Sequence, residues 1–167
     1  MPKDETRTLR QAQGEGIILW KPVLMLHLIK LCVGVETLEE LARWQAKRVA
    51  ALKKKRAKPE LVHVTRQTPK RAAELLDGGS LYWVIKGHIA ARQRLVDIRA
   101  ARAKDGVPRC GLVYEPKLVP TVRWARDPFQ GWRYLNPKDA PPDVRAVQRA
   151  IGLPAALCAE LAELGLL

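Results

Sequence analysis

Residues 78–94 read GGSLYWVIKGHIAARQR, and this stretch decides the fold. It begins with two glycines that can end a helix and continues through aromatic and β-branched residues, which favour strands. Gly87 interrupts the apolar run, and small and apolar residues then alternate with basic ones. The pattern predicts two strands joined by a tight bend, at residues 81–86 and 88–99. Because both sides of the first strand are largely apolar, we expect it in the interior of a sheet.

The segment before this stretch predicts a strand followed by a helix. Residues 26–33 form an apolar run, and Thr37-Leu38-Glu39-Glu40 is a capping box. In such a box the Thr37 hydroxyl accepts from a free helix N–H, and Glu40 reaches back to the Thr37 backbone N–H. We expect the helix to run from Leu38 to near Lys53. Its buried face, set by helical spacing with Gln45 as the polar exception, is Leu38, Leu41, Ala42, Gln45, Val49 and Leu52.

The remaining elements follow from turn residues and apolar spacing. Thr68 is a candidate N-cap with Pro69 at the first helical position, and the short helix that it predicts ends at Gly78. Strands are expected at residues 61–65, 109–114 and 118–124, an aromatic segment at 128–135, and helices after Pro142 and Pro154. The sequence therefore predicts an α+β fold: a single compact domain over residues 25–167, with a curled mixed or antiparallel sheet, an N-terminal amphipathic helix and C-terminal helices.

Composition limits the partners and the compartment. The chain has 167 residues, of which 47% are hydrophobic and 28% charged, as in one globular domain. A net charge of +13 favours an anionic partner, although a solvated basic surface would give the same value. The three cysteines are widely spaced and odd in number, which is typical of reduced thiols in the cytoplasm. No CxxC or CxxH pair exists, so we expect no metal site and no cofactor.

Residues 1–24 differ from the rest of the chain. Their apolar run, residues 17–20, is too short to span a membrane and is followed by Pro22. Asp4 and Glu5 near the start do not fit a signal peptide. We expect a flexible extension that arises from an upstream start site, with the folded domain beginning at Met25, and no contact with a membrane.

Several sequence blocks carry a resemblance to a known family. They are HLIKLCVG at residues 27–34, HVTR at 63–66, GGSLYWVIKG at 78–87, RQR at 92–94 and FQGWRYL at 129–135. In this order they resemble the bacterial domain-of-unknown-function family 1489, from residue 25 to the end, and that resemblance implies no activity. More distantly, the order of elements is similar to the PUA, ASCH and EVE class of pseudobarrels. This second resemblance implies a PUA-like pseudobarrel that binds RNA or modified bases.

Charge and aromatic residues favour nucleic acid, most of all RNA, as the partner. Residues 43–71 contain eleven basic residues and one acid, Glu60, and seven of the nine aromatic residues lie between positions 82 and 134. Cations bind phosphates, and exposed aromatic faces stack on unpaired bases. We expect Tyr82 and Trp83 to lie mainly in the core. The predicted nucleic-acid-binding residues are Arg66, Lys70, Arg71, Lys86, Arg92, Arg94, Trp132 and Arg133.

Two other functions remain open from the sequence. A nuclease-like or RNA-processing enzyme could use His63 and Thr65 with Arg66 and Lys70 to position a phosphoryl group. No Ser-His-Asp spacing, P-loop or paired carboxylates support it, so no catalytic residue is assigned. The third hypothesis is an adaptor that docks on a protein through its Leu-rich C-terminal helix, although a helix that closes the domain's own core is favoured. RNA, single-stranded DNA and duplex are not distinguished.

Overall fold

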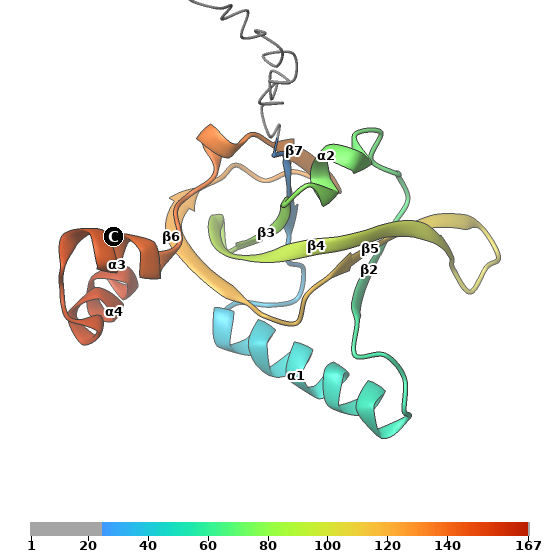
Figure 1. The fold of residues 1–167 in the computed structure, drawn as a ribbon, viewed down its shortest axis with the longest axis horizontal. Helices are drawn as coiled ribbons and strands as arrows, with labels where there is room; N and C mark the ends of the chain where they lie inside the picture. The colour runs from blue at the N-terminus through green and yellow to red at the C-terminus, as the bar shows by residue number, and fades with distance from the viewer. Residues whose placement is uncertain (1–24, 167) are drawn as a thin grey trace, which may run out of the picture.

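The computed structural model describes residues 25–166, and its centre is a seven-stranded mixed sheet (Figure 1). The strands run in the order β2-β5-β4-β3-β1-β7, and β6 pairs with β4 outside this path. The sheet curls, but its two edges do not pair with each other, so it is an open sheet. The predicted α+β class is confirmed. The strands are β1 His27–Leu31, β2 Leu61–Thr65, β3 Ser80–Ile85, β4 His88–Arg102, β5 Pro108–Tyr114, β6 Val119–Ala125 and β7 Trp132–Leu135.

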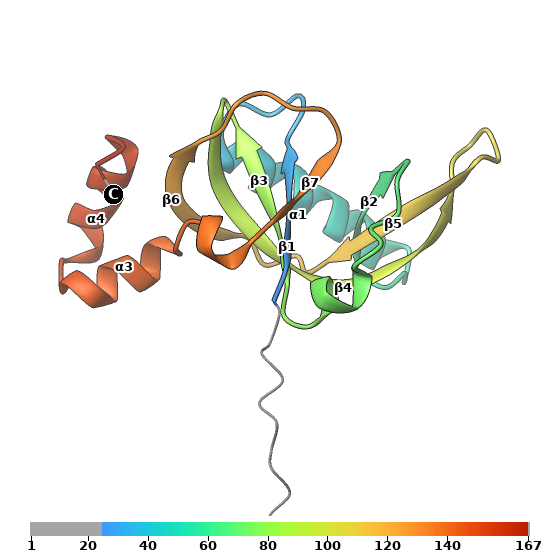
Figure 2. The ribbon, with the colours of Figure 1, turned by 90° about the horizontal axis from the view of Figure 1, so that it is seen from above.

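The long strand β4 organises the sheet. Its first half pairs with both β3 and β6, and its second half pairs with β5. Irregular pairing between Ile89 and Ala91 and between Leu95 and Asp97 increases the local twist and bends the strand. The β4–β5 hairpin consequently projects from the domain (Figures 1 and 2). Strand β3 lies between β4 and β1 with all six residues buried, which confirms its predicted interior position.

The glycine pair before β3 is required by close packing. Gly78 has a φ of +89°, in the left-handed region. A Cβ on Gly79 would lie 2.2 Å from the backbone oxygens of both Leu26 and Leu75. Only glycine fits at a backbone approach of this kind. The turn therefore brings the start of β3 beside β1, and these two strands pair in parallel.

Helix α1, Leu38–Lys54, lies across one face of the sheet (Figure 1). Its capping box is confirmed in one half, because the Glu40 N–H donates to the Thr37 hydroxyl at 3.2 Å. The Glu40 carboxylate instead accepts from the N–H of Glu36 at 2.9 Å, one residue before the predicted partner. Leu41 and Gln45 are buried as predicted, whereas Ala42 is exposed because it lies on the flank of the helix.

Helix α2, Ala72–Leu76, begins later than the sequence predicts. Thr68 is not its N-cap; Arg71 occupies that position. The Arg71 N–H donates to the hydroxyl of Tyr134 on β7 at 3.2 Å, so a tertiary contact satisfies a donor at the helix start.

The core has two parts, one on each face of the sheet. The larger part lies between the sheet and α1 and includes Leu28, Leu81 and Trp83. The smaller part lies on the opposite face and includes Ile29, Tyr82 and Val84. Successive residues of β1 and β3 alternate between these two faces, as the geometry of a strand requires. Trp83 and Tyr82 are both only 4% exposed, which confirms their predicted place in the core. We call the α1 side the inner face and the other side the outer face.

The C-terminal segment packs beside the sheet. A short 3-10 helix, Pro137–Asp139, is followed by α3, Val144–Ile151, and α4, Ala155–Glu163. The two α-helices contact each other, α3 also contacts β6, and both project from one side of the domain (Figures 1 and 2). No described side chain of α3 or α4 belongs to either part of the core, although Cys158 of α4 is fully buried, so whether this tail closes the core stays a prediction. The predicted extension, residues 1–24, lies outside the described residues. Within residues 25–166 no helix has the length and apolar character to cross a membrane.

Candidate ligand-binding site

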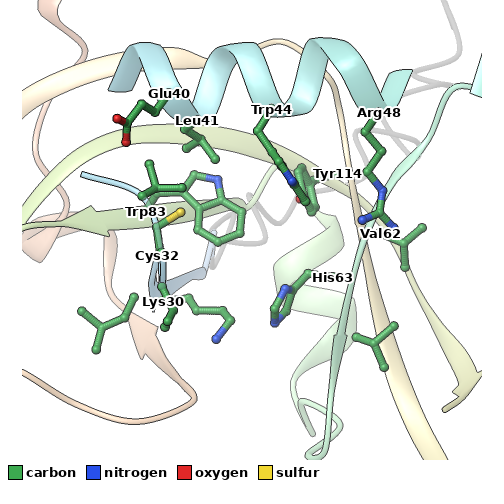
Figure 3. A pocket seen from close by; sticks show the side chains of 15 residues that line it. Lys30, Cys32, Glu40, Leu41, Trp44, Arg48, Val62, His63, Trp83 and Tyr114 are labelled. Atoms are coloured by element: carbon green, nitrogen blue, oxygen red, sulfur yellow. The ribbon is translucent and has the colours of Figure 1, made fainter. Parts of the chain in front are cut away.

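A hollow of about 770 Å³ opens between α1 and the inner face of the sheet. Figure 3 shows Trp44 and Arg48 reaching from α1 toward the strands that carry Trp83 and His63. We call this hollow the α1 pocket. Its lining residues are Lys30, Leu31, Cys32, Val33, Gly34, Val35, Glu40, Leu41, Trp44, Arg48, Val62, His63, Val64, Trp83 and Tyr114.

A buried amide network fixes Trp83 at the pocket. Gln45 on α1 and Gln93 on β4 exchange side-chain hydrogen bonds of 2.9 and 2.8 Å. The Trp83 indole N–H donates to the Gln93 oxygen at 2.7 Å, and the Gln93 amide also donates to the backbone oxygen of Glu115 at 2.9 Å. Buried polar groups of this kind must be satisfied, and a satisfied network is rigid. Gln45, the polar exception in the predicted apolar face, is therefore the residue that ties α1 to the sheet.

The pocket wall is aromatic. The Trp83 and Tyr114 rings meet edge to face with centroids 5.6 Å apart, and the His63 ring meets Trp83 in the same manner at 6.2 Å. Trp44 differs from these rings because it is 50% exposed. The Arg48 guanidinium lies 5.5 Å from the centroid of the Trp44 ring, one helical turn away on α1. The pocket thus has a fixed aromatic wall opposite an exposed indole that carries a cation.

Burial shifts the protonation of the pocket side chains. It lowers the pKa of His63 to about 4, with the nearby charges of Lys30 and Arg48 acting in the same direction. At neutral pH His63 is therefore uncharged, with one nitrogen that donates and one that accepts. Burial also lowers the pKa of Lys30 and raises the pKa of Cys32, and it raises the pKa of Tyr114 to about 12. The pocket consequently presents neutral hydrogen-bonding groups between the cations Lys30 and Arg48, with the acid Glu40 near the start of α1.

A family model described as "Protein of unknown function (DUF1489)" matches residues 28–167. The chain belongs to this family. The predicted resemblance to it is confirmed, and the family description carries no activity to transfer. Searches of curated proteins and of solved structures found no match. The comparisons therefore give no support to the more distant similarity to PUA-like pseudobarrels.

The predicted nucleic-acid-binding residues do not form one surface. Arg66 and Lys70 are exposed in the segment between β2 and α2. Arg71 is also exposed, but it pairs with Glu74 through two hydrogen bonds and lies 5.6 Å from the centroid of the Tyr134 ring. Lys86 has an ion pair of 3.0 Å with Glu36.

Arg92 and Arg94 share one side of β4, and this side is the outer face, away from the α1 pocket. The Arg92 guanidinium donates to both carboxylate oxygens of Asp143 at 2.7 and 2.8 Å and to the Ser80 hydroxyl at 3.1 Å. Asp143 is the N-cap residue of α3, yet its side chain makes no capping hydrogen bond because it is held by Arg92. Arg92 thus joins the sheet to α3. Arg94 is exposed and has no ion pair within residues 25–166.

Trp132 and Arg133 are both held by backbone oxygens. The Trp132 indole N–H donates to Gln67 at 3.1 Å, and its ring packs edge to face on Tyr134 with centroids 5.1 Å apart. Because Gln67 follows β2 and Trp132 belongs to β7, this contact joins the two open edges of the sheet. Arg133 donates to the oxygens of Gln130 and Trp132 and lies on the outer face, as the partner of Ile29 in the ladder.

The cluster proposed for an enzyme is not assembled. His63 lines the α1 pocket, whereas Arg66 and Lys70 are exposed beyond the end of β2. In the described part of the chain, no hydrogen bond or ion pair joins His63 to either of them, and no group of three or more His, Cys, Asp or Glu side chains could hold a metal. Sequence reasoning missed Trp44 and Arg48 as site residues. Their i, i+4 spacing beside Leu41 and Gln45 is the pattern that places them at the edge of the buried helix face.

Proposed function

We propose that the protein binds single-stranded nucleic acid, with RNA as the expected partner, by taking one unpaired base into the α1 pocket. The observation that carries this proposal is the half-exposed Trp44 ring with Arg48 beside it at the pocket, while the buried Trp83 and Tyr114 rings form the fixed apolar wall behind. Unpaired bases stack on aromatic side chains and on guanidinium planes, and Trp44 with Arg48 offers both. The pocket volume of about 770 Å³ is also within the range of about 300–1,000 Å³ that is usual for ligand sites.

The polar groups of the pocket suit the edge of a base. Base edges carry hydrogen-bond donors and acceptors but no charge. A neutral His63 can donate from one nitrogen and accept at the other, and the Lys30 ammonium adds donors beside it. These groups determine which base the pocket prefers, and binding of oligonucleotides of different base composition measures this preference.

The phosphates would follow the C-terminal half of α1 and the loop after it. Of the eleven cations in residues 43–71, Lys58 and Arg71 have acidic partners, Glu60 and Glu74. The acids Glu36, Glu39 and Glu40 cluster instead at the start of α1 and would repel a phosphate there. The other nine cations of residues 43–71 make no ion pair with a described residue: Arg43, Lys47, Arg48, Lys53, Lys54, Lys55, Arg56, Arg66 and Lys70.

The proposal is tested by fluorescence anisotropy with labelled single-stranded RNA, comparing the wild type with Trp44→Ala. Loss of one stacking platform should cost about 1–3 kcal/mol of binding, roughly a 5- to 150-fold weaker affinity. The matched control is Trp124→Ala, because Trp124 is similarly exposed, at 40%, but lies on β6 outside the pocket. If both variants bind as the wild type does, the pocket is not the base site.

Salt dependence tests the phosphate path separately. Each phosphate contact to a single strand contributes a slope of about −0.7 to a plot of log affinity against log salt concentration. Lys47→Ala should make this slope shallower by about one contact, whereas Trp44→Ala should leave it unchanged. A flat salt response of the wild type, or no binding at low salt, would contradict a nucleic-acid function.

A further inference from the structure

A second hollow, of about 410 Å³, lies in the segment that connects β6 to β7. It is separate from the α1 pocket, since the two share no lining residue. We call it the β6–β7 hollow. Its lining residues are Ala125, Arg126, Asp127, Pro128, Phe129 and Arg133.

Backbone oxygens orient both of its guanidinium groups. The Arg126 Nη2 donates to the backbone oxygen of Asp139 at 2.9 Å, and its own backbone N–H donates to Gly87 at 2.7 Å. The Arg133 Nη1 donates to the backbone oxygens of Gln130 and Trp132 at 2.8 and 2.9 Å. These bonds fix the guanidinium positions without neutralising their charge.

The two arginines differ in their remaining contacts. The Arg133 guanidinium lies 5.7 Å from the centroid of the Phe129 ring, which favours a cation over its face. The Arg126 Nε is buried and has no hydrogen-bond partner among residues 25–166. A guanidinium has five N–H donors, so each arginine keeps donors for a ligand after its backbone contacts.

The charge of the hollow is not balanced. Neither Arg126 nor Arg133 has an ion pair with a described residue, whereas Arg92, Arg99 and Arg109 elsewhere on the sheet each pair with a carboxylate. Asp127 lines the hollow but does not reach within ion-pair distance of either guanidinium. Two cations that share a hollow repel each other, and the repulsion is relieved by an anion between them.

We propose that the β6–β7 hollow binds a phosphate group. Guanidinium forks match the oxygens of a phosphate and bind it through paired hydrogen bonds, which a single ammonium cannot do. This inference does not depend on the base site, because Arg133 lies on the outer face and the α1 pocket on the inner one. The phosphate could belong to a small phosphate ester or to the end of a nucleic acid, and the experiment separates these sources.

The test is an NMR titration of the arginine Nε–Hε signals with inorganic phosphate. Signals of Arg126 and Arg133 should shift saturably, and sodium chloride at the same ionic strength should not reproduce the shift. Arg133→Gln should weaken the apparent phosphate affinity by about tenfold or more, as expected for loss of a charge-assisted pair. The control Arg94→Gln changes an exposed arginine on β4 that has no ion pair with a described residue, and it should leave the phosphate affinity unchanged. Equal shifts with chloride, or equal effects of both substitutions, would overturn the proposal.

A second variant changes the affinity in the opposite direction. Asp127 is the only acid among the described residues that line the hollow. The Asp127→Asn variant should therefore bind phosphate several-fold more tightly than the wild type. An unchanged or weaker affinity would count against the site.

Anisotropy with 5′-phosphorylated and 5′-hydroxyl forms of one RNA then identifies the source of the phosphate. Tighter binding of the phosphorylated form that Arg133→Gln abolishes assigns the hollow to a nucleic-acid end, and equal binding assigns it to a small ester. The phosphate titration stands even if no RNA binds.

Discussion

The two faces of the sheet use polar residues in opposite ways. On the inner face, Gln45 and Gln93 make a neutral network that holds Trp83 at the wall of the α1 pocket. On the outer face, Arg92 and Asp143 make a charged pair that holds α3 to the sheet. An arginine that pairs with a carboxylate stabilises the fold and has little charge left for a ligand, whereas a cation without a partner can bind one. The location of charge in the sequence is therefore a poor guide to the binding surface unless the partners are known.

The largest effect is expected from breaking the inner network. Gln93→Ala removes the acceptor of the Trp83 indole and the partner of Gln45, all of them buried. A buried polar group left without a partner costs about 1–3 kcal/mol, so we expect about 3 kcal/mol of lost unfolding free energy in total. Urea unfolding should show a lower midpoint with an unchanged m value.

A matched variant separates the network from simple packing. The double substitution Gln45→Leu with Gln93→Leu removes both amides and fills their space, so it should cost less than Gln93→Ala alone. If the double variant is the less stable of the two, the amides stabilise the fold by more than satisfying each other's hydrogen bonds. In either variant Trp83 loses its fixed orientation, and RNA affinity should fall with it.

An intermediate effect is expected on the outer face. Arg92→Ala removes charge-assisted hydrogen bonds to Asp143 and Ser80. Hydrogen bonds to charged groups contribute about 1.5–3 kcal/mol, and the released Asp143 can then cap α3, so we expect a net loss of about 2 kcal/mol. Arg94→Ala on the same side of β4 should stay within about 0.5 kcal/mol of the wild type.

The two substitutions should also differ in binding. Neither Arg92 nor Arg94 faces the α1 pocket, so neither should change the affinity for an unpaired base by more than a peripheral phosphate contact would. A double-mutant cycle of Arg92→Ala with Asp143→Ala measures the coupling of the pair. Equal stability losses for Arg92→Ala and Arg94→Ala would mean that the ion pair contributes nothing.

The sequence predicts the elements of this fold better than its contacts. Alternating apolar residues and the glycine pair identify β3 as an interior strand, and the capping box starts α1 at Leu38 as observed. Local patterns do not specify that Gln45 meets Gln93, 48 residues away, or that Arg92 meets Asp143, 51 residues away. Tertiary packing alone decides these pairs. The sequence places Arg92 among the binding residues because it lies in a cationic stretch, and it does not show that Asp143 neutralises this charge.

A pH-dependent effect concerns two histidines, one on each face. Burial lowers the pKa of both to about 4, aided by Arg92 at His27 and by Lys30 and Arg48 at His63. His27 lies on the outer face, where its Nδ1 accepts from the Ser80 N–H at 3.1 Å and its ring meets that of Tyr82. Because the folded pKa is below the unfolded value of about 6.5, the unfolded chain binds the proton first.

Stability should therefore be constant above pH 7, fall as the pH drops from about 6.5 toward 4, and fall no further from these groups below that window. Between pH 7 and 5.5 the loss of unfolding free energy is about 1 kcal/mol for each histidine after a reduction for solvent screening.

NMR titration of the two histidine rings shows how much of the effect comes from each face. Arg92→Ala should raise the pKa of His27 and leave that of His63 unchanged, because only His27 is near Arg92. Bound RNA should perturb His63 and not His27, since only His63 lines the α1 pocket. A shift of His27 alone on adding RNA would place the ligand on the outer face and reverse the assignment of the two surfaces.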